Sequence, residues 1–275
     1  MKILISVDME GVADITNSVQ CRRDSSEFAR SCELMTGEAV AAIDGARKGG
    51  ATDIVVNDSH GDMRNIEHEK LPPDVRLIRG NIKPLLMVQG AEPGVAGVVF
   101  IGYHAPSSTV DGICDHVYLG AQVQEMKLNG ETCSEARMNA ALVGAMDIPA
   151  ICISGDQSAC ADAVRYLPWI KTIQVKHALG NASAVMLSPA SARSAIADGV
   201  AAAVREIRTK AFQPYRPEPP LTLEISLKGS QKADVAAMIP GVERVGGRTV
   251  RFVSDDVETV FKASIAIMRV ASTVD

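Results

Sequence analysis

The chain has 275 residues, 47% of them hydrophobic, which suffices for one large domain or two small ones with a buried core. Its formal net charge is −5 and it has no run of Lys or Arg, so nucleic acid and anionic membrane surfaces are not expected partners. No apolar stretch reaches the roughly 18 residues of a transmembrane helix, and no cleavable signal segment follows Met1. We therefore expect a cytoplasmic protein whose six cysteines, which lack CxxC spacing, are free thiols.

The first half of the chain alternates predicted strands and helices. An apolar strand at 2–7 precedes a helix at 26–48, whose apolar residues recur at helical spacing, and Gly49-Gly50 separates that helix from a second strand at 51–56. A small strand at 75–78, a helical turn at 84–88 and a strand at 96–101 follow. The pattern predicts an α/β fold with a mostly parallel sheet and flanking helices.

The pattern continues to residue 212, with one ambiguous segment. Residues 117–123 and 125–128 could pair as a hairpin or form an edge excursion. We then expect a helix at 134–145, a strand at 149–154, a helix at 158–166, a strand at 170–175 and a long helix at 188–208. Ser188 is the expected N-cap of the long helix, with Pro189 at its first position.

Four prolines between residues 213 and 220 predict a stiff linker. Beyond it we expect a strand at 221–227, a helix at 232–238, a hairpin of 242–245 with 249–253, and a closing amphipathic helix at 256–270. The sequence thus predicts a metal-binding α/β domain at 1–212 and a smaller α+β lobe at 221–275. The second unit could be a separate domain or a lobe packed on the first.

Polar residues follow three of the predicted strands. Asp8 and Glu10 come after the first strand, His60 after the second, and His104 after the strand at 96–101. Taken singly, each could be an ordinary loop or core residue. Because parallel strands bring their carboxyl ends to one edge of a sheet, we expect these side chains to converge there.

A mixed set of carboxylates and imidazoles suits zinc or a similar first-row ion. One zinc ion takes three or four protein ligands, so a richer set indicates two metal ions sharing a bridging carboxylate, for which Asp8 is placed best. Glu135, near the start of a predicted helix, could complete the set, and Glu131 competes for that role. His116 lies beyond the Pro- and Gly-containing loop that follows His104, a placement that suits either a mobile catalytic group or a surface loop histidine. His68 and His177 lie among charged residues and should be solvated.

Two other functions fit parts of this pattern. A two-metal phosphoesterase uses similar ligands, but only Arg64 and Arg137 lie near them in sequence to hold a phosphate. A nucleotide-binding module on a Rossmann-like sheet would need a GxGxxG segment after the first strand, where Asp8 and Glu10 would instead repel phosphate.

The strand-end motifs together resemble one known family. They are Ser6-Val7-Asp8-Met9-Glu10-Gly11, Asn57-Asp58-Ser59-His60, Gly102-Tyr103-His104-Ala105 and Ser134-Glu135, joined by Met35-Thr36-Gly37-Glu38 and Ser188-Pro189-Ala190. In this order, and over nearly the whole chain, they resemble the D-aminopeptidase family of zinc peptidases, which is related to the bacterial dipeptide-transport operon protein.

The resemblance implies a specific activity and site. Asp8, Glu10, His60, His104 and Glu135 would hold two Zn²⁺ ions per subunit, and His116 would be the catalytic histidine. The enzyme would be a binuclear metallo-aminopeptidase that hydrolyses the amide bond next to a free amino group in small peptides or amides of D-amino acids. L-aminoacyl amides and non-peptide amides remain alternative substrates. The resemblance also implies a ring-like homo-oligomer, with a decameric ring as the expected form.

Overall fold

A seven-stranded sheet forms the centre of the molecule. The computed structural model describes residues 1–209 and 212–274; residues 210, 211 and 275 of the two predicted domains lie outside this part of the chain. The strand order is β3-β2-β1-β4-β7-β8-β9. Its strands are β1 (Lys2–Val7), β2 (Asp53–Asp58), β3 (Arg76–Ile78), β4 (Val95–Ile101), β7 (Ala150–Asp156), β8 (Lys171–Ala178) and β9 (Ala184–Met186). All pairs are parallel except β8 with β9, so the predicted α/β fold with a mostly parallel sheet is confirmed.

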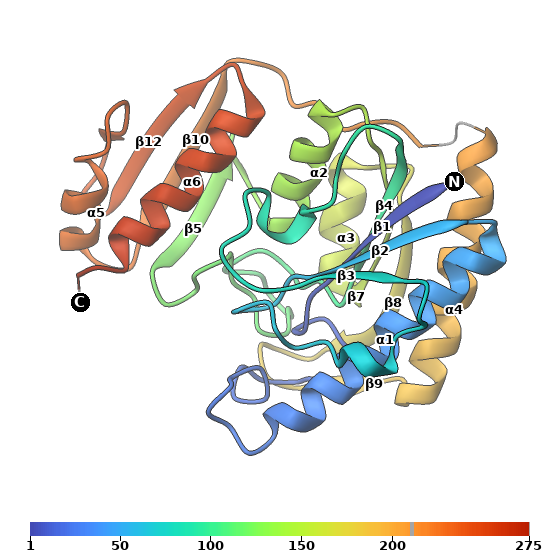
Figure 1. The fold of residues 1–275 in the computed structure, drawn as a ribbon. Helices are drawn as coiled ribbons and strands as arrows, with labels where there is room; N and C mark the ends of the chain where they lie inside the picture. Colours follow the sequence, from blue (N-terminus) through green and yellow to red (C-terminus); the bar gives the residue numbers. More distant parts are fainter. Residues whose placement is uncertain (210–211, 275) are drawn as a thin grey trace.

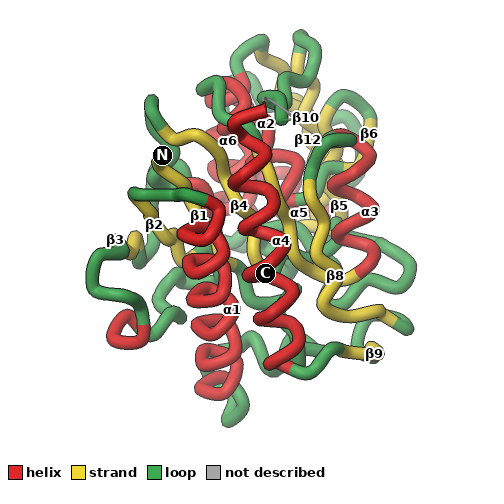
Figure 2. Tube along the Cα trace, turned by 90° about the vertical axis from the view of Figure 1, so that its right-hand side faces the viewer, coloured by secondary structure: helices red, strands yellow, loops and turns green. Residues whose placement is uncertain are grey.

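Helices cover both faces of this sheet (Figure 1). The first face carries α1 (Phe28–Gly49) and α4 (Pro189–Glu206), which lie side by side in Figure 2. The other face carries α2 (Glu135–Ala145), α3 (Gln157–Tyr166) and the 3₁₀ turn η2 (Leu86–Val88). Alternate residues of β1 serve the two faces: Ile3 and Ile5 pack with the α1 and α4 side chains, and Leu4 packs toward α2. Both faces are buried, which explains why these strands read as continuous apolar runs.

Local signals at the helix ends act as the sequence predicts. Gly50, at φ 101°, ends α1 in a left-handed conformation that glycine adopts without strain. Ser188 accepts a hydrogen bond from the Ser191 N–H and caps α4, with Pro189 as the first helical residue. Two further 3₁₀ turns are η1 (His68–Lys70) and η3 (Ile207–Thr209).

A second, antiparallel sheet packs beside the first. Its order is β11-β12-β10-β5-β6, from β5 (Val123–Leu128), β6 (Glu131–Thr132), β10 (Leu221–Leu227), β11 (Glu243–Arg244) and β12 (Thr249–Ser254). Two helices complete this unit, α5 (Ser230–Ala236) and α6 (Val257–Ala271). The pairing of β11 with β12 is the expected hairpin around Gly246-Gly247.

The second sheet decides between the two alternatives for residues 117–128 and bears on the predicted domain division. Of the two alternatives for 117–123 and 125–128, the hairpin does not form: residues 117–122 lie in a loop of bends and turns, and β5 pairs with β10 and β6. The partner strand β10 lies almost a hundred residues away in sequence, so a local pattern could not identify it. The division at the 213–220 linker stays a prediction, although β5 and β6, from before the linker, supply part of the sheet beyond it.

No described helix combines the length and the apolar character needed to cross a membrane. The six cysteines are free, as expected. His68 and His177 are exposed, also as expected.

Candidate metal centre

The loops that follow β1, β2 and β4 meet at the carboxyl edge of the large sheet. β1 lies between β2 and β4, so the Asp8 loop is flanked by the loops that carry His60 and His104. The chain runs from β1 outward through β2 and β3, then returns to the other side of β1 as β4. Such a reversal of strand order opens a crevice at the carboxyl ends, where open α/β sheets bind their ligands.

Close backbone contacts fix the Asp8 loop against the β4 loop. The Asp8 N–H donates to the Ile101 carbonyl at 2.8 Å, and the Gly11 N–H donates to the Gly102 carbonyl at 2.7 Å. A Cβ atom on Gly11 would lie 2.0 Å from the Tyr103 carbonyl oxygen, so only glycine fits there. The motif Asp8-Met9-Glu10-Gly11 therefore owes its glycine to packing between two site loops.

The structure brings all five expected ligands together. His60 Nδ1 lies 2.9 Å from Glu10 Oε2 and 3.4 Å from Asp8 Oδ1. His104 Nε2 lies 3.5 Å from Asp8 Oδ2 and 3.3 Å from Glu135 Oε1. Asp8 thus stands between the two imidazoles, in the place expected of a bridging carboxylate. All five residues are at least 90% buried.

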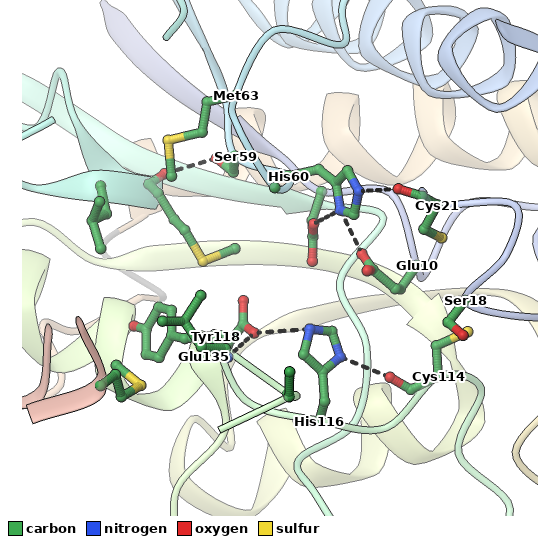
Figure 3. Close-up of a pocket in the computed structure, with 18 of the residues that line it drawn as sticks. Glu10, Ser18, Cys21, Ser59, His60, Met63, Cys114, His116, Tyr118 and Glu135 are labelled. Carbon is green, nitrogen blue, oxygen red and sulfur yellow. Dashed lines mark hydrogen bonds and ion pairs between the residues drawn. The ribbon is translucent and has the colours of Figure 1, made fainter. Parts of the chain in front are cut away.

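Backbone carbonyls set the orientation of the imidazoles. His60 Nε2 donates to the Cys21 carbonyl at 2.9 Å, and His104 Nδ1 donates to the Ala105 carbonyl at 2.9 Å. A carbonyl oxygen can only accept, so each ring carries its N–H there and turns its other nitrogen toward the carboxylates, as Figure 3 shows for His60. A second nitrogen held by a hydrogen bond is the usual arrangement of metal-ligating histidines.

Two buried atoms at the centre lack a hydrogen-bond partner among the described residues: Asp8 Oδ2 and His104 Nε2. Buried polar atoms are normally paired, so an orphaned acceptor beside an orphaned ring nitrogen indicates a cation between them. The ligand atoms of Asp8, Glu10 and His104 lie within 4.8 Å of one another, as do those of His104, His116 and Glu135. These residues therefore fit a metal ion.

The pKa values of the ionisable groups in the metal-free site also indicate that a cation binds there. Burial, and then repulsion by Glu10, raises the pKa of Asp8 to about 7. Burial also opposes ionisation of Glu10 and Glu135, but neighbouring His60 and His104 respectively hold the pKa of these carboxyls below the usual value. Although burial favours neutral imidazoles, the same carboxylates raise the pKa of His60 and His104 well above the usual range. Asp8, Glu10 and Glu135 can therefore all be ionised only if positive charge lies beside them.

Glu135 and Glu131 occupy different environments. Glu135, the first residue of α2, accepts a hydrogen bond from the Tyr118 N–H at 2.6 Å and faces both His104 and His116. The Glu131 side chain is 62% exposed and pairs with Arg137 at 3.1 Å. Of the two, only Glu135 reaches the centre.

His116 lies on the other side of Glu135, with its ring stacked on His104 at a centroid distance of 4.1 Å. Its Nδ1 donates to the Cys114 carbonyl at 2.8 Å, which leaves Nε2 3.7 Å from Glu135 Oε1 (Figure 3). Burial, followed by the adjacent His104, lowers the pKa of His116. The ring side chain is 25% exposed, more than any of the expected ligands.

Comparison with known proteins identifies the family. The family model for D-aminopeptidases, peptidase family M55, matches residues 1–266. The chain belongs to the D-aminopeptidase family. A D-aminopeptidase of Bacillus subtilis (strain 168) is 31% identical over 272 residues, which cover 98% of each chain. The solved structure of DppA from Bacillus subtilis, a zinc-dependent D-aminopeptidase described as a self-compartmentalizing protease, superposes with a TM-score of 0.95 at 30% identity and covers 100% of this chain and 99% of that one.

The family resemblance seen in the sequence is therefore confirmed, and so are its enzyme class and activity. This D-aminopeptidase family member has a cavity of about 610 Å³ at the metal centre. Asp8, Glu10, His60, His116 and Glu135 line it. So do residues from α6, which places the second sheet unit against the substrate space of the peptidase.

Sequence reasoning missed a buried lysine that supports the Asp8 loop of the peptidase. Lys176, on β8, is 2% exposed, and its Nζ donates to the carbonyls of Glu10, Val12 and Ile15 at 2.6, 2.9 and 2.8 Å. These bonds fix the turn that aims Glu10 at His60. The sequence offers little signal for this role, because Gln174 and His177 of the same strand are also polar.

Glu38 of α1 also holds this loop, and the ionisation of its buried carboxyl destabilises the folded protein. Its Oε1 accepts a hydrogen bond from the Ala13 N–H at 2.9 Å, whereas Oε2 is buried without a partner among the described residues. Burial raises its pKa to about 7, against 4.5 for an ordinary glutamate, although the Ala13 N–H, Lys176 and Arg193 oppose the shift.

We expect Glu38→Gln to remove part of the pH dependence of folding. Because the folded-state pKa is raised, the protonated carboxyl favours the folded state below about pH 4.5, and this advantage is lost as pH rises through 7. The free energy of unfolding of the variant, relative to the original protein, should rise by about 3 kcal/mol between pH 4.5 and 8. Urea denaturation at both pH values measures it; a constant difference would contradict this account of Glu38.

Proposed function

We propose that the peptidase holds two zinc ions at Asp8, Glu10, His60, His104 and Glu135 and hydrolyses the amide bond that follows an N-terminal D-amino acid. The observation that carries this proposal is the pair of imidazoles whose outer nitrogens are fixed by backbone carbonyls and whose inner nitrogens face three buried carboxylates. The zinc dependence of DppA supports the choice of metal. Five ligands exceed what one zinc ion takes, which favours two ions bridged by Asp8.

Bound zinc would supply an activated water at neutral pH and polarise the scissile carbonyl. The protein side chains account for the other requirements of the reaction. The free amino group of the substrate would lie at the zinc ions in its neutral form, which would place its first amide bond at the centre. His116 donates its Nδ1 hydrogen to the Cys114 carbonyl, so its unprotonated Nε2 faces the cavity, where it can take the proton released by the attacking water and pass it to the departing amine.

The environment of the arginines argues against a phosphoesterase. Arg64 pairs with Asp62 at 2.8 Å, and Arg137 pairs with Glu131 and Tyr215. Neither lines the cavity. Arg22 and Arg269 do line it, but Arg22 is paired with Asp24 at 2.7 Å and Arg269 comes from α6 rather than from a loop that bears the expected ligands.

A substrate panel tests the proposed function. We expect purified protein to hydrolyse D-alanine p-nitroanilide with a kcat/KM at least about 10-fold above that for the L-enantiomer, and to leave p-nitrophenyl phosphate intact. A chelator should abolish the activity and zinc should restore it. Equal rates for the two enantiomers would contradict D-selectivity, and cleavage of the phosphate ester alone would reassign the chemistry.

We also propose that the chain forms a homo-oligomer, with a decameric ring as the specific expectation. The description of DppA as self-compartmentalizing supports this, because such a protease encloses its active sites by assembly. A monomeric mass in multi-angle light scattering would contradict it.

A further inference from the structure

The cavity at the metal centre has cationic side chains on a wall that the sheet-edge motifs do not supply. Three cationic residues line it: Arg22, in the loop between β1 and α1, and Lys228 and Arg269. Lys228 follows β10 directly, and Arg269 lies in the last turn of α6, so both come from the second sheet unit. The metal end of the same cavity carries the carboxylates of Asp8, Glu10 and Glu135. A substrate with a negative charge at the end that lies away from the metal site matches these cationic side chains.

Two of these cations are free to bind a ligand. Arg22 is engaged by Asp24, with a contact of 2.7 Å. Neither Lys228 nor Arg269 has an ion-pair partner within the described ranges 1–209 and 212–274. Asp115, which lines both cavities with Lys228, accepts hydrogen bonds from Asn181 at 2.5 Å and from the Thr109 N–H at 3.1 Å and forms no ion pair with either cation among the described residues.

Lys228 borders the same space as His116. Both residues line the main cavity and also a smaller cavity of about 130 Å³, together with Asp115 and Gly120. The Lys228 N–H donates to the Gln122 carbonyl at 2.8 Å, which ties the start of the lysine side chain to the loop that follows His116. The position of Lys228 relative to His116 is therefore set by backbone contacts and not only by a flexible side chain.

In a dipeptide the leaving nitrogen and the terminal carboxylate lie close together, so the space that His116 and Lys228 share indicates which substrate fits. When the amide bond breaks, the departing amino acid takes a proton on its nitrogen, and its carboxylate is separated from that nitrogen by a single carbon atom. A group that protonates the nitrogen and a group that binds the carboxylate must therefore border one small volume. In this structure His116 and Lys228 satisfy that condition.

We propose that Lys228 binds the free C-terminal carboxylate of a dipeptide substrate, so that the enzyme prefers dipeptides to the corresponding C-terminal amides. This inference rests on the proposed aminopeptidase function and specifies its substrate class. Lys228 is a specificity-determining residue in this scheme: its ammonium group donates to the carboxylate, a charge-assisted hydrogen bond that strengthens as the substrate excludes water from the cavity. Arg269 provides a second positive charge on the same wall.

The test compares D-alanyl-glycine with D-alanyl-glycinamide in zinc-loaded full-length protein. We expect the kcat/KM ratio of dipeptide to amide to be about 10 or more in the original protein and to fall toward 1 in Lys228→Ala, with most of the ratio kept in Lys228→Arg. Lys262→Ala is the matched control, because Lys262 also lies on the second unit but pairs with Glu258 and does not line the cavity. Its ratio should equal that of the original protein.

The possible outcomes separate this inference from the function on which it rests. Turnover of both substrates with a ratio near 1 in the original protein, or an unchanged ratio in Lys228→Ala, would overturn the role of Lys228 and leave the aminopeptidase function standing. Turnover of neither substrate would overturn both. Lys228 is exposed, so its replacement should not impair folding; equal melting temperatures and zinc contents of the variants verify this.

Discussion

Replacing His116 with Ala is expected to lower kcat at least about 10²-fold while the protein keeps its full zinc content. The reason is the position of the ring: its Nε2 faces the cavity and lies farther from the carboxylates than the inner nitrogens of His60 and His104 do. The ring is also the most exposed of the three. We therefore expect it to transfer protons rather than to hold metal. Steady-state kinetics on D-alanine p-nitroanilide and elemental analysis of the same preparation measure both quantities.

The structure also allows His116 to be a metal ligand, and the zinc content of His116→Ala decides between the two roles. The ligand atoms of His104, His116 and Glu135 lie within 4.8 Å of one another, a spacing that a metal ion could bridge. If His116→Ala loses one zinc ion per chain, His116 is a ligand and the proton donor must be sought elsewhere. His116→Gln provides a comparison of similar size that cannot donate as an acid.

Much of the site could be predicted because it depends on a simple topological rule. Apolar runs followed at once by Asp8, His60 and His104 reveal strand ends, and parallel strands bring such ends together. Glu135 was harder to place, since Glu131 lies only four residues earlier. The structural difference is that Glu135 begins α2 inside the protein, whereas Glu131 lies on the exposed short strand β6.

The supporting contacts could not be predicted from the same pattern. The Cys21 and Cys114 carbonyls orient His60 and His116. Every residue has a backbone carbonyl, so the sequence does not indicate which of them a side chain will contact. Lys176 reaches the Glu10 loop across 166 residues, and β5 finds its partner β10 in the C-terminal segment. Such contacts depend on how distant segments pack, which local periodicity does not encode.

Replacing Asp8 with Asn should have the largest effect of all on activity. The variant keeps the size of the side chain but loses the negative charge with which Asp8 is proposed to bridge two zinc ions, so we expect zinc binding to fail and kcat/KM to fall at least about 10³-fold. The metal-free variant should nevertheless be more stable at pH 8 than the metal-free original protein. Burial and Glu10 raise the folded-state pKa of Asp8 to about 7. The protonated Asp8 carboxyl therefore favours the folded state at low pH, and this stabilisation of the folded protein is lost as pH rises through 7. Asn is neutral at every pH and loses nothing.

Thermal unfolding with and without zinc measures both effects. We expect zinc to raise the melting temperature of the original protein and to leave that of Asp8→Asn unchanged, because a ligand stabilises only a protein that binds it. Ser59→Ala is a suitable control, since Ser59 also lies in a site loop but bonds to Ser6 and Met87 rather than to the carboxylates. A zinc-induced shift of full size in Asp8→Asn would contradict the bridging role of Asp8.

The most direct test of the central claim is the zinc content of the purified, active protein, measured by elemental analysis against protein concentration. A centre built from Asp8, Glu10, His60, His104 and Glu135 predicts two zinc ions per chain, with the loss of D-aminoacyl amide hydrolysis on their removal. Full activity in protein that carries no metal ion would contradict the account.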